Sequence, residues 1–217
     1  MSRQLGAPIK ALLGVNLLRH LNPTFDYAGG QFVVRTFAPP MPPQATRIPV
    51  FYAKGGGMVI RSELGPEKSP VPAVLMLDTS MSFPLALDDA GWKKAGVDTA
   101  KLEPVPREPK YKQGIVPVVR LGAFDIPQVP AVWGVPIAEL EQGVQIDLDG
   151  VVGASMLGAF RITLVDEGRT MWLEDLPMPP PSPPPAAEPQ PAPAAPAEPP
   201  KAKPKTPKAK KGEVKAK

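Results

Sequence analysis

The residues best placed for chemistry are Asp78, Thr79 and Ser80. Asp78 ends the apolar run VPAVLMLD at positions 71–78, and Thr79 and Ser80 follow it directly. A continuous apolar run of this length, ending in an acid, predicts a buried strand that delivers a side chain. A carboxylate presented in this way is a candidate for proton transfer. The run therefore marks Asp78 as the leading candidate for a functional acid.

Several other chemistries are excluded or find little support. The sequence has no cysteine, which excludes disulfides, thiolate metal sites and cysteine nucleophiles. His20 is the single histidine, so a serine–histidine triad or a multi-histidine metal site would have to use it. Residues 147–150 faintly resemble a calcium loop, but position 12 of that loop would be Gly158 in place of glutamate. We expect a turn there, and no metal or cofactor.

The end of the chain differs sharply in composition from the rest. Residues 177–217 contain 15 of the 33 prolines and eight lysines, and they carry a net charge of +5 against −1 for the remainder. Such a segment cannot bury enough apolar surface to offset its chain entropy, which predicts a disordered tail with polyproline bias. It is either a solvating tail or a weak, salt-dependent binder of anionic polymers.

About 175 residues precede the tail, which is enough for one sizeable core. No apolar run is long enough for a transmembrane helix. The amino end has the basic and apolar residues of a signal peptide but no small-residue cleavage site, so we interpret it as part of the fold. As written, the chain would stay in the cytoplasm. If upstream sequence is missing, the cell envelope and secretion remain alternative locations.

The pattern between these ends is mostly that of strands. Alternating or continuous apolar runs of five to ten residues recur between glycine and proline signals. Two short segments look helical instead, at 85–95 and 154–160. The sequence thus predicts an all-β fold with one or two short helices, its strands lying at 48–52, 57–62, 71–78, 115–121, 126–135, 161–165 and 170–174.

One segment of the chain recurs. Residues 12–35, here called the leading segment, align without a gap on residues 151–174, the trailing segment, at a constant offset of 139. Such self-similarity indicates two copies of one structural unit. Only the end of the first copy would be present. The identical pairs are Gly14/Gly153, Leu18/Leu157, Thr24/Thr163 and Gly29/Gly168.

The order of these pieces resembles one lobe of the pepsin/retropepsin superfamily of aspartic peptidases. That family has an apolar–apolar–Asp–Thr/Ser–Gly motif. Later in the chain come an apolar–apolar–Gly motif, a helix and a hairpin. Here LDTS at positions 77–80 is followed about seventy residues later by VVG at positions 151–153. The resemblance implies a closed or partly open β-barrel lobe.

The resemblance also implies roles for the motif residues. Asp78 would be the catalytic acid and Thr79 the residue that braces the acid pair, with Ser80 at the position of the family glycine. The second motif, Val151, Val152 and Gly153, would thread beneath them as the psi-shaped loop.

The leading segment holds the same threading motif for a preceding lobe, at Leu12, Leu13 and Gly14. The resemblance therefore divides the chain into the end of a first lobe (1–37), a proline-rich connector (38–47), a complete lobe (48–176) and the tail (177–217).

Two departures from the family bear on activity. The mechanism needs two carboxylates that share a proton, and a single Asp78 cannot supply both. The equivalent acid of the first copy, 139 residues before Asp78, would lie ahead of Met1. Ser80 replaces a glycine that lets the backbone turn closely under the acids, and Met81 adds bulk beside it.

The leading hypothesis is thus an aspartic-peptidase-family protein that is degenerate or incomplete as written and inactive as an isolated chain, with a groove suited to extended peptide. One alternative is an active endopeptidase whose second aspartate comes from a dimer partner or from missing upstream sequence. The other is a scaffold protein that acts through its basic tail on anionic polymers.

Overall fold

The computed structural model describes residues 13–106 and 108–175. Leu12 and the predicted tail lie outside this range, so their assignments stay predictions. Twelve strands form the described part, and their bounds are β1 (Thr24–Asp26), β2 (Gln31–Val33), β3 (Ala45–Tyr52), β4 (Met58–Gly65), β5 (Val71–Asp78), β6 (Leu85–Leu87), β7 (Glu103–Val105), β8 (Glu108–Leu121), β9 (Phe124–Trp133), β10 (Gly150–Gly153), β11 (Phe160–Val165) and β12 (Thr170–Asp175).

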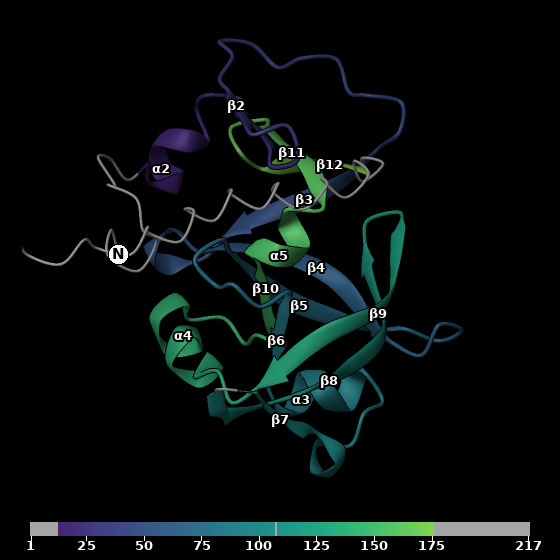
Figure 1. Ribbon diagram of the computed structural model, residues 1–217. Coiled ribbons are helices and arrows are strands. Elements are labelled where there is room, and N and C mark those ends of the chain that lie inside the picture. Colours follow the sequence, from purple (N-terminus) through teal and green to yellow (C-terminus); the bar gives the residue numbers. More distant parts are fainter. Residues whose placement is uncertain (1–12, 107, 176–217) are drawn as a thin grey trace, which may run out of the picture. The chain divides into compact units, whose positions relative to one another are not determined.

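Six strands close into a barrel in the order β4-β5-β10-β6-β9-β8, because β8 pairs back onto β4. Two of the pairings are parallel, β5 with β10 and β6 with β9. The short strands β10 and β6 thus pair with each other in the barrel wall, between the longer strands β5 and β9 (Figure 1). Strands enclosed in this way are apolar on both faces, and β6 and β10 are buried along their whole length.

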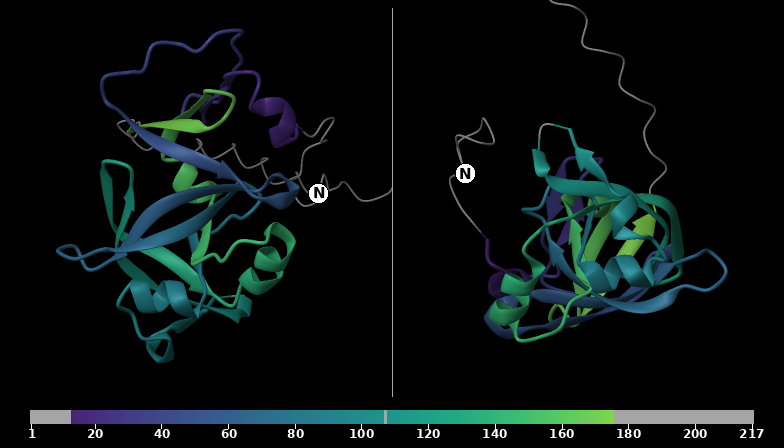
Figure 2. Two further views of the ribbon diagram at one scale, coloured as in Figure 1. Left: turned by 180° about the vertical axis from the view of Figure 1, so that it is seen from behind. Right: turned by 90° about the horizontal axis from the view of Figure 1, so that it is seen from below.

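A second group of strands extends from the barrel through β3. Strand β12 pairs with β3, β11 with β12, β1 with β11, and β2 with β1, all antiparallel. The leading segment (purple) therefore lies beside the β11–β12 hairpin (green) in every view (Figures 1 and 2).

Short helices fill the connections between strands. Asp88 caps the first turn of the helix that follows β6, because its Oδ1 accepts the N–H of Gly91 at 2.7 Å. Gly96, with φ +72°, ends that helix. The bounds are α2 (Val15–Leu18), α3 (Asp89–Lys94), α4 (Ile137–Val144), α5 (Ala154–Leu157), and the 3-10 turns η1 (Lys54–Gly56) and η2 (Thr99–Lys101).

The core fills the barrel and continues beneath the β11–β12 hairpin. Trp92 of α3 is fully buried, as are Leu75 of β5 and Leu87 of β6. Phe160 of β11 stacks on Phe124 of β9 at 5.8 Å between ring centroids, which joins the hairpin to the barrel. The barrel and the hairpin therefore share one continuous apolar cluster.

The predicted all-β fold is confirmed, and β5 has the predicted bounds. One expectation was wrong: residues 85–95 do not form a single helix, because residues 85–87 are strand β6 and the helix begins at Asp89. Strand β7 and helix α4 were not predicted. Glycines 55–57 lie at the connection between β3 and β4.

Candidate functional site

Asp78 is the last residue of β5, at the barrel end that faces the leading segment. Its Oδ1 accepts two hydrogen bonds from Ser80, one from the backbone N–H at 2.8 Å and one from the hydroxyl at 2.6 Å. The side chain therefore holds its own turn in place. Ser80 supplies a hydroxyl donor that the family glycine lacks.

The threading motif lies directly beside this acid. Strand β10 runs parallel to β5, with Gly153 opposite Asp78 and Val152 opposite Leu77. Val151 and Val152 are buried on opposite sides of β10, each in a different part of the core. The structure thus brings the two predicted motifs together in one register.

Gly153 allows the chain to pass close beneath the Asp78 loop. Its N–H donates to the carbonyl of Pro84 at 3.0 Å, and the next N–H, of Ala154, donates to the carbonyl of Met81 at 2.8 Å. A β-carbon at position 153 would clash with the carbonyl oxygens of Met81 and Phe83. Only glycine fits this crossing.

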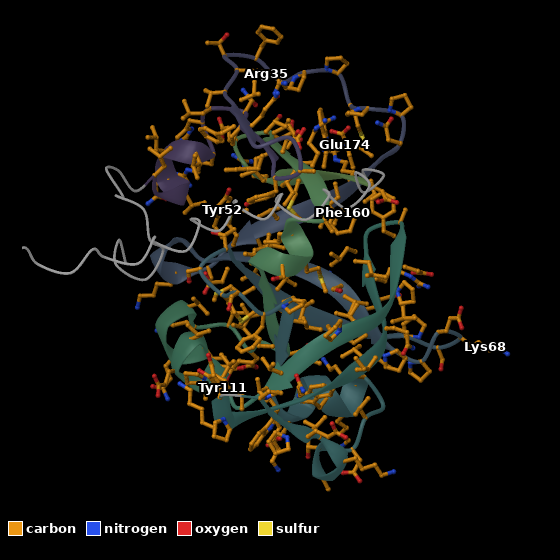
Figure 3. All side chains as sticks on the ribbon, viewed as in Figure 1. Arg35, Tyr52, Lys68, Tyr111, Phe160 and Glu174 are labelled. Carbon is orange, nitrogen blue, oxygen red and sulfur yellow. The ribbon has the colours of Figure 1, made fainter. Side chains whose placement is uncertain are left out.

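Residues on the loop beyond Asp78 are fixed to neighbouring elements. The hydroxyl of Ser155, at the start of α5, donates to the carbonyl of Ser82. Phe83 meets Tyr111 of β8 edge-on, with 5.6 Å between ring centroids. Figure 3 labels Tyr111 at the end of the barrel opposite to Glu174. The loop is therefore tied both to α5 and to the β7–β8 hairpin.

Thr79 is exposed, and within the described residues its hydroxyl has no recorded hydrogen bond. Asp78 and Thr79 both border an open pocket of about 760 Å³. Most of its wall is apolar, and it comes from both sides: Leu18 and Phe25 of the leading segment, and Leu77 of the barrel. The pocket thus lies between the barrel and the leading segment, with the carboxylate at its rim.

A partly buried ion pair positions the start of β10. The carboxylate of Asp149 accepts hydrogen bonds from the ammonium group of Lys94 at 2.7 Å and from the backbone N–H of Val74 at 2.8 Å. Asp149 immediately precedes β10, so these contacts attach the start of β10 to α3 and β5. Asp149 thus has a structural role that its sequence pattern, DLDG, did not reveal. Within residues 13–106 and 108–175, no group of acids or histidines is arranged to hold a metal ion.

The acids at the start of α3 act as helix-start residues. Burial raises the pKa of Asp88 above its usual value, although the N–H of Gly91 donates to its carboxylate. Asp89 is exposed and accepts the indole N–H of Trp133 at 2.8 Å. His20 is exposed in the turn after α2 and does not line the pocket beside Asp78.

The leading segment packs on the trailing segment through a symmetrical contact. Thr24 of β1 lies opposite Thr163 of β11, and their hydroxyls are 2.9 Å apart and buried. Two residues along, Arg161 donates to the carboxylate of Asp26 at 2.7 Å. The backbone N–H of Gly29 donates to the same carboxylate, and with Arg161 it lowers the pKa of Asp26.

The predicted motif of the leading segment is only partly described. Gly14 precedes α2, and Leu13 is exposed. No strand pairs with these two residues among the described ones. The structure thus brings together the motifs at Asp78 and Gly153, and leaves the motif at Gly14 without a counterpart.

Comparisons with known proteins give a structural likeness at low sequence identity. No family model matches the chain, and no curated protein sequence matches it. Among solved structures, it is similar to a retropepsin-like aspartic protease from Rickettsia conorii, with 19% identity and a TM-score of 0.43. The match covers 59% of this chain and 90% of that one. No helix in the described residues is long and apolar enough to span a membrane.

Proposed function

We propose that the barrel and its following helix and hairpin form a lobe of aspartic-peptidase type, with Asp78 at the position of the catalytic acid. One observation carries this proposal. Asp78 ends strand β5, in which Ala73, Leu75 and Met76 are buried. It lies in parallel register with Gly153, the last residue of a short apolar strand that threads beneath its loop. The arrangement joins the two sequence motifs and delivers a carboxylate to an open pocket.

The lobe is half of a catalytic unit. Peptide hydrolysis by this chemistry uses two carboxylates that share one proton, so that one activates water while the other polarises the carbonyl. The described residues place one acid, Asp78, at the pocket. One chain thus supplies one of the two acids, and cleavage would need the second from a dimer partner or from another lobe. Its apolar pocket, open beside Asp78, is suited to hold side chains of an extended peptide.

We further propose that the leading and trailing segments are duplicated units, and three features support this. Helices α2 and α5 differ in position by the same 139 residues that separate the sequences. The β1–β2 and β11–β12 hairpins share the same register, so Asp26 faces Gln31 as Val165 faces Thr170. The two hairpins pair with each other through β1 and β11, where the equivalent residues Thr24 and Thr163 lie opposite each other.

Cleavage of a quenched-fluorescent peptide library tests the function. The protein is purified from its source, with and without Asp78→Asn, and assayed at acid and neutral pH with and without pepstatin. We expect pepstatin-sensitive cleavage at acid pH that the substitution abolishes, because one ionisable partner of the pair is gone. The chain held as a monomer should not cleave, because it supplies a single acid.

Asp98→Asn is the matched control. Asp98 is an exposed acid that, like Asp78, accepts a backbone N–H from two residues on, here that of Ala100, but it caps η2 and does not line the pocket. It should leave cleavage unchanged. Absence of cleavage by the folded source protein at every pH would refute the peptidase proposal, as would cleavage that survives Asp78→Asn.

A further inference from the structure

The pocket beside Asp78 carries a single charge. Apart from Tyr27, Thr79 and Asp78, the described residues that line it are leucine, isoleucine, valine, methionine, phenylalanine and glycine. None of these lining residues is a lysine, an arginine or a histidine. Burial raises the pKa of Tyr27 above its usual value, so its phenol stays neutral. Asp78 is therefore the one charged side chain that the described residues place at this pocket near neutral pH.

Three aromatic rings form part of the pocket wall, and all of them belong to the leading segment. The ring of Phe25 lies 5.1 Å from that of Phe32 and 6.3 Å from that of Tyr27, measured between centroids. Phe25 and Tyr27 are stacked, with 15° between their ring planes. Tyr27 and Phe32 are 43% and 46% exposed. The rings thus make one continuous apolar surface that a ligand can still reach.

The rest of the wall is aliphatic and adaptable. Leu77 and Met58 come from the barrel, Ile162 and Leu164 from β11, and Met171 from β12. Methionine side chains are flexible and make favourable contacts with aromatic rings. The volume of about 760 Å³ lies within the range of about 300–1,000 Å³ that is typical of small-molecule sites. The pocket therefore has the size and the lining to hold an apolar molecule.

The carboxylate of Asp78 has one oxygen left for such a molecule. Both hydrogen bonds from Ser80 end on Oδ1, and they hold the carboxylate in place. Oδ2 accepts no hydrogen bond from the described residues. An ionised carboxylate has acceptor sites on both oxygens. Oδ2, together with the unpaired hydroxyl of Thr79, is thus available to a donor in the pocket.

We propose that this pocket binds a small molecule with an aromatic body and a single ammonium group. The body lies against the rings of Phe25, Tyr27 and Phe32. The ammonium group donates a hydrogen bond to Oδ2 of Asp78, and the neighbouring ring faces add to its attraction. An anionic molecule of the same shape would meet the carboxylate with no cation to offset the repulsion, and a neutral one would gain nothing from the charge of Asp78.

This inference goes beyond the proposed function. Hydrolysis of a peptide needs two carboxylates, whereas binding of an amine needs Asp78 alone and breaks no bond. A chain that supplies one acid is therefore sufficient for it. Binding can be measured without any assay of cleavage.

Three ligands that differ only in their polar end test the proposal. The full chain of 217 residues is titrated by calorimetry at pH 7 and about 0.15 M salt with 1-naphthaleneethylamine, 1-naphthaleneethanol and 1-naphthaleneacetate. We expect the amine to bind once per chain and at least about tenfold more tightly than the alcohol, because it alone forms a charge-assisted hydrogen bond. The acetate should bind most weakly.

Asp78→Asn tests the partner of the ammonium group. The variant keeps the shape of the side chain and removes its charge, so the amine should bind it about as weakly as the alcohol does. The affinity of the alcohol should not change. Asp98→Asn is the control, because Asp98 is an exposed acid that does not line the pocket, and it should leave both affinities unchanged.

Phe32→Ala tests the place of the aromatic body. Phe32 lines the pocket, so its loss should weaken the amine and the alcohol alike, by at least about threefold. Leu17→Ala is the matched control in the same segment. Leu17 is 51% exposed and does not line the pocket, so this variant should bind both ligands as the parent does.

Each other result overturns the inference. Equal affinities for the amine and the alcohol, or absence of binding, would mean that Asp78 does not select a cation. Tightest binding of the acetate would assign the binding to basic side chains elsewhere in the chain. Amine binding that survives Asp78→Asn would place the ammonium group at another acid, and equal losses in Phe32→Ala and Leu17→Ala would place the body outside the pocket.

The comparison of the three ligands uses the parent chain, so it decides the question even where a variant fails to fold. Peptide cleavage enters none of these measurements. Amine binding without any cleavage would leave this inference standing and the proposed function refuted, and cleavage without amine binding would do the reverse.

Discussion

The leading and trailing segments show one pattern of residues in two environments. Each has a glycine, a one-turn helix and a hairpin in the same register. In the trailing segment the apolar side chains are core, because the barrel lies against them, and in the leading segment the same positions are open. Local sequence therefore sets the helix and the hairpin, whereas burial depends on what the rest of the chain provides.

The largest effect should come from truncating matched core positions. Leu173→Ala removes a fully buried side chain and should lower the free energy of unfolding by about 2–5 kcal/mol. Val34→Ala, at the counterpart, should cost less than about 1 kcal/mol in the recombinant chain, since Val34 is already half in water. Urea denaturation measures both. Equal losses would mean that Val34 is covered in the recombinant chain.

The matched glycines should differ next. Gly153→Ala puts a methyl group against the carbonyls of Met81 and Phe83 and should destabilise the chain by about 1–3 kcal/mol. Gly14→Ala has free space and should stay within about 0.5 kcal/mol of the parent. The same denaturation experiment measures both variants. A large cost at Gly14 would show that another part of the chain already crosses it.

The contact between the two segments gives a smaller effect. Thr163→Val removes one hydroxyl of the buried pair with Thr24 and should cost about 1 kcal/mol. The double variant with Thr24→Val should cost less than the sum of the two single ones, because both lose the same hydrogen bond. Strict additivity in this double-mutant cycle would mean that the two hydroxyls do not interact in solution.

The sequence signals that predicted strand β5 and the position of Asp78 at its end are local. An apolar run that ends in an acid gave β5 and Asp78, and a fixed offset gave the helix and hairpin at both ends of the chain. It assigned residues 85–87 to a helix, because three apolar residues before an acidic cap fit either element. Those residues are a strand because β10 and β9 enclose them, and both partners are distant in sequence.

The rest depends on contacts that no local pattern contains. The Lys94–Asp149 ion pair joins residues 55 apart, and the DLDG pattern gives no sign of it. The exposure of Leu17 and Phe32 was equally hidden, because their sequence is that of a core. Only the pairing of the strands shows that one copy of the pattern is covered and the other is not.

The last difference between the segments is their response to pH. Asp26 lies where the trailing segment has Val165, and its carboxylate pairs with Arg161, which also donates to Glu174 of the trailing hairpin at 3.4 Å. The N–H of Gly29, together with Arg161, holds the pKa of Asp26 below its usual 3.8. A lowered folded-state pKa gives stability that is present above 3.8 and is lost as the pH falls through the lower value.

Asp26→Asn removes this contribution. We expect the variant to unfold at lower urea concentration than the parent at neutral pH, and the difference to shrink as the pH falls below 3.8. Val165→Ala is the control at the counterpart: its cost comes from lost packing, so it should not change with pH over the same range. A difference for Asp26→Asn that stays constant with pH would show that the carboxylate charge does not hold the leading hairpin, and would assign the contact to the strand pairing and the Thr24–Thr163 hydrogen bond.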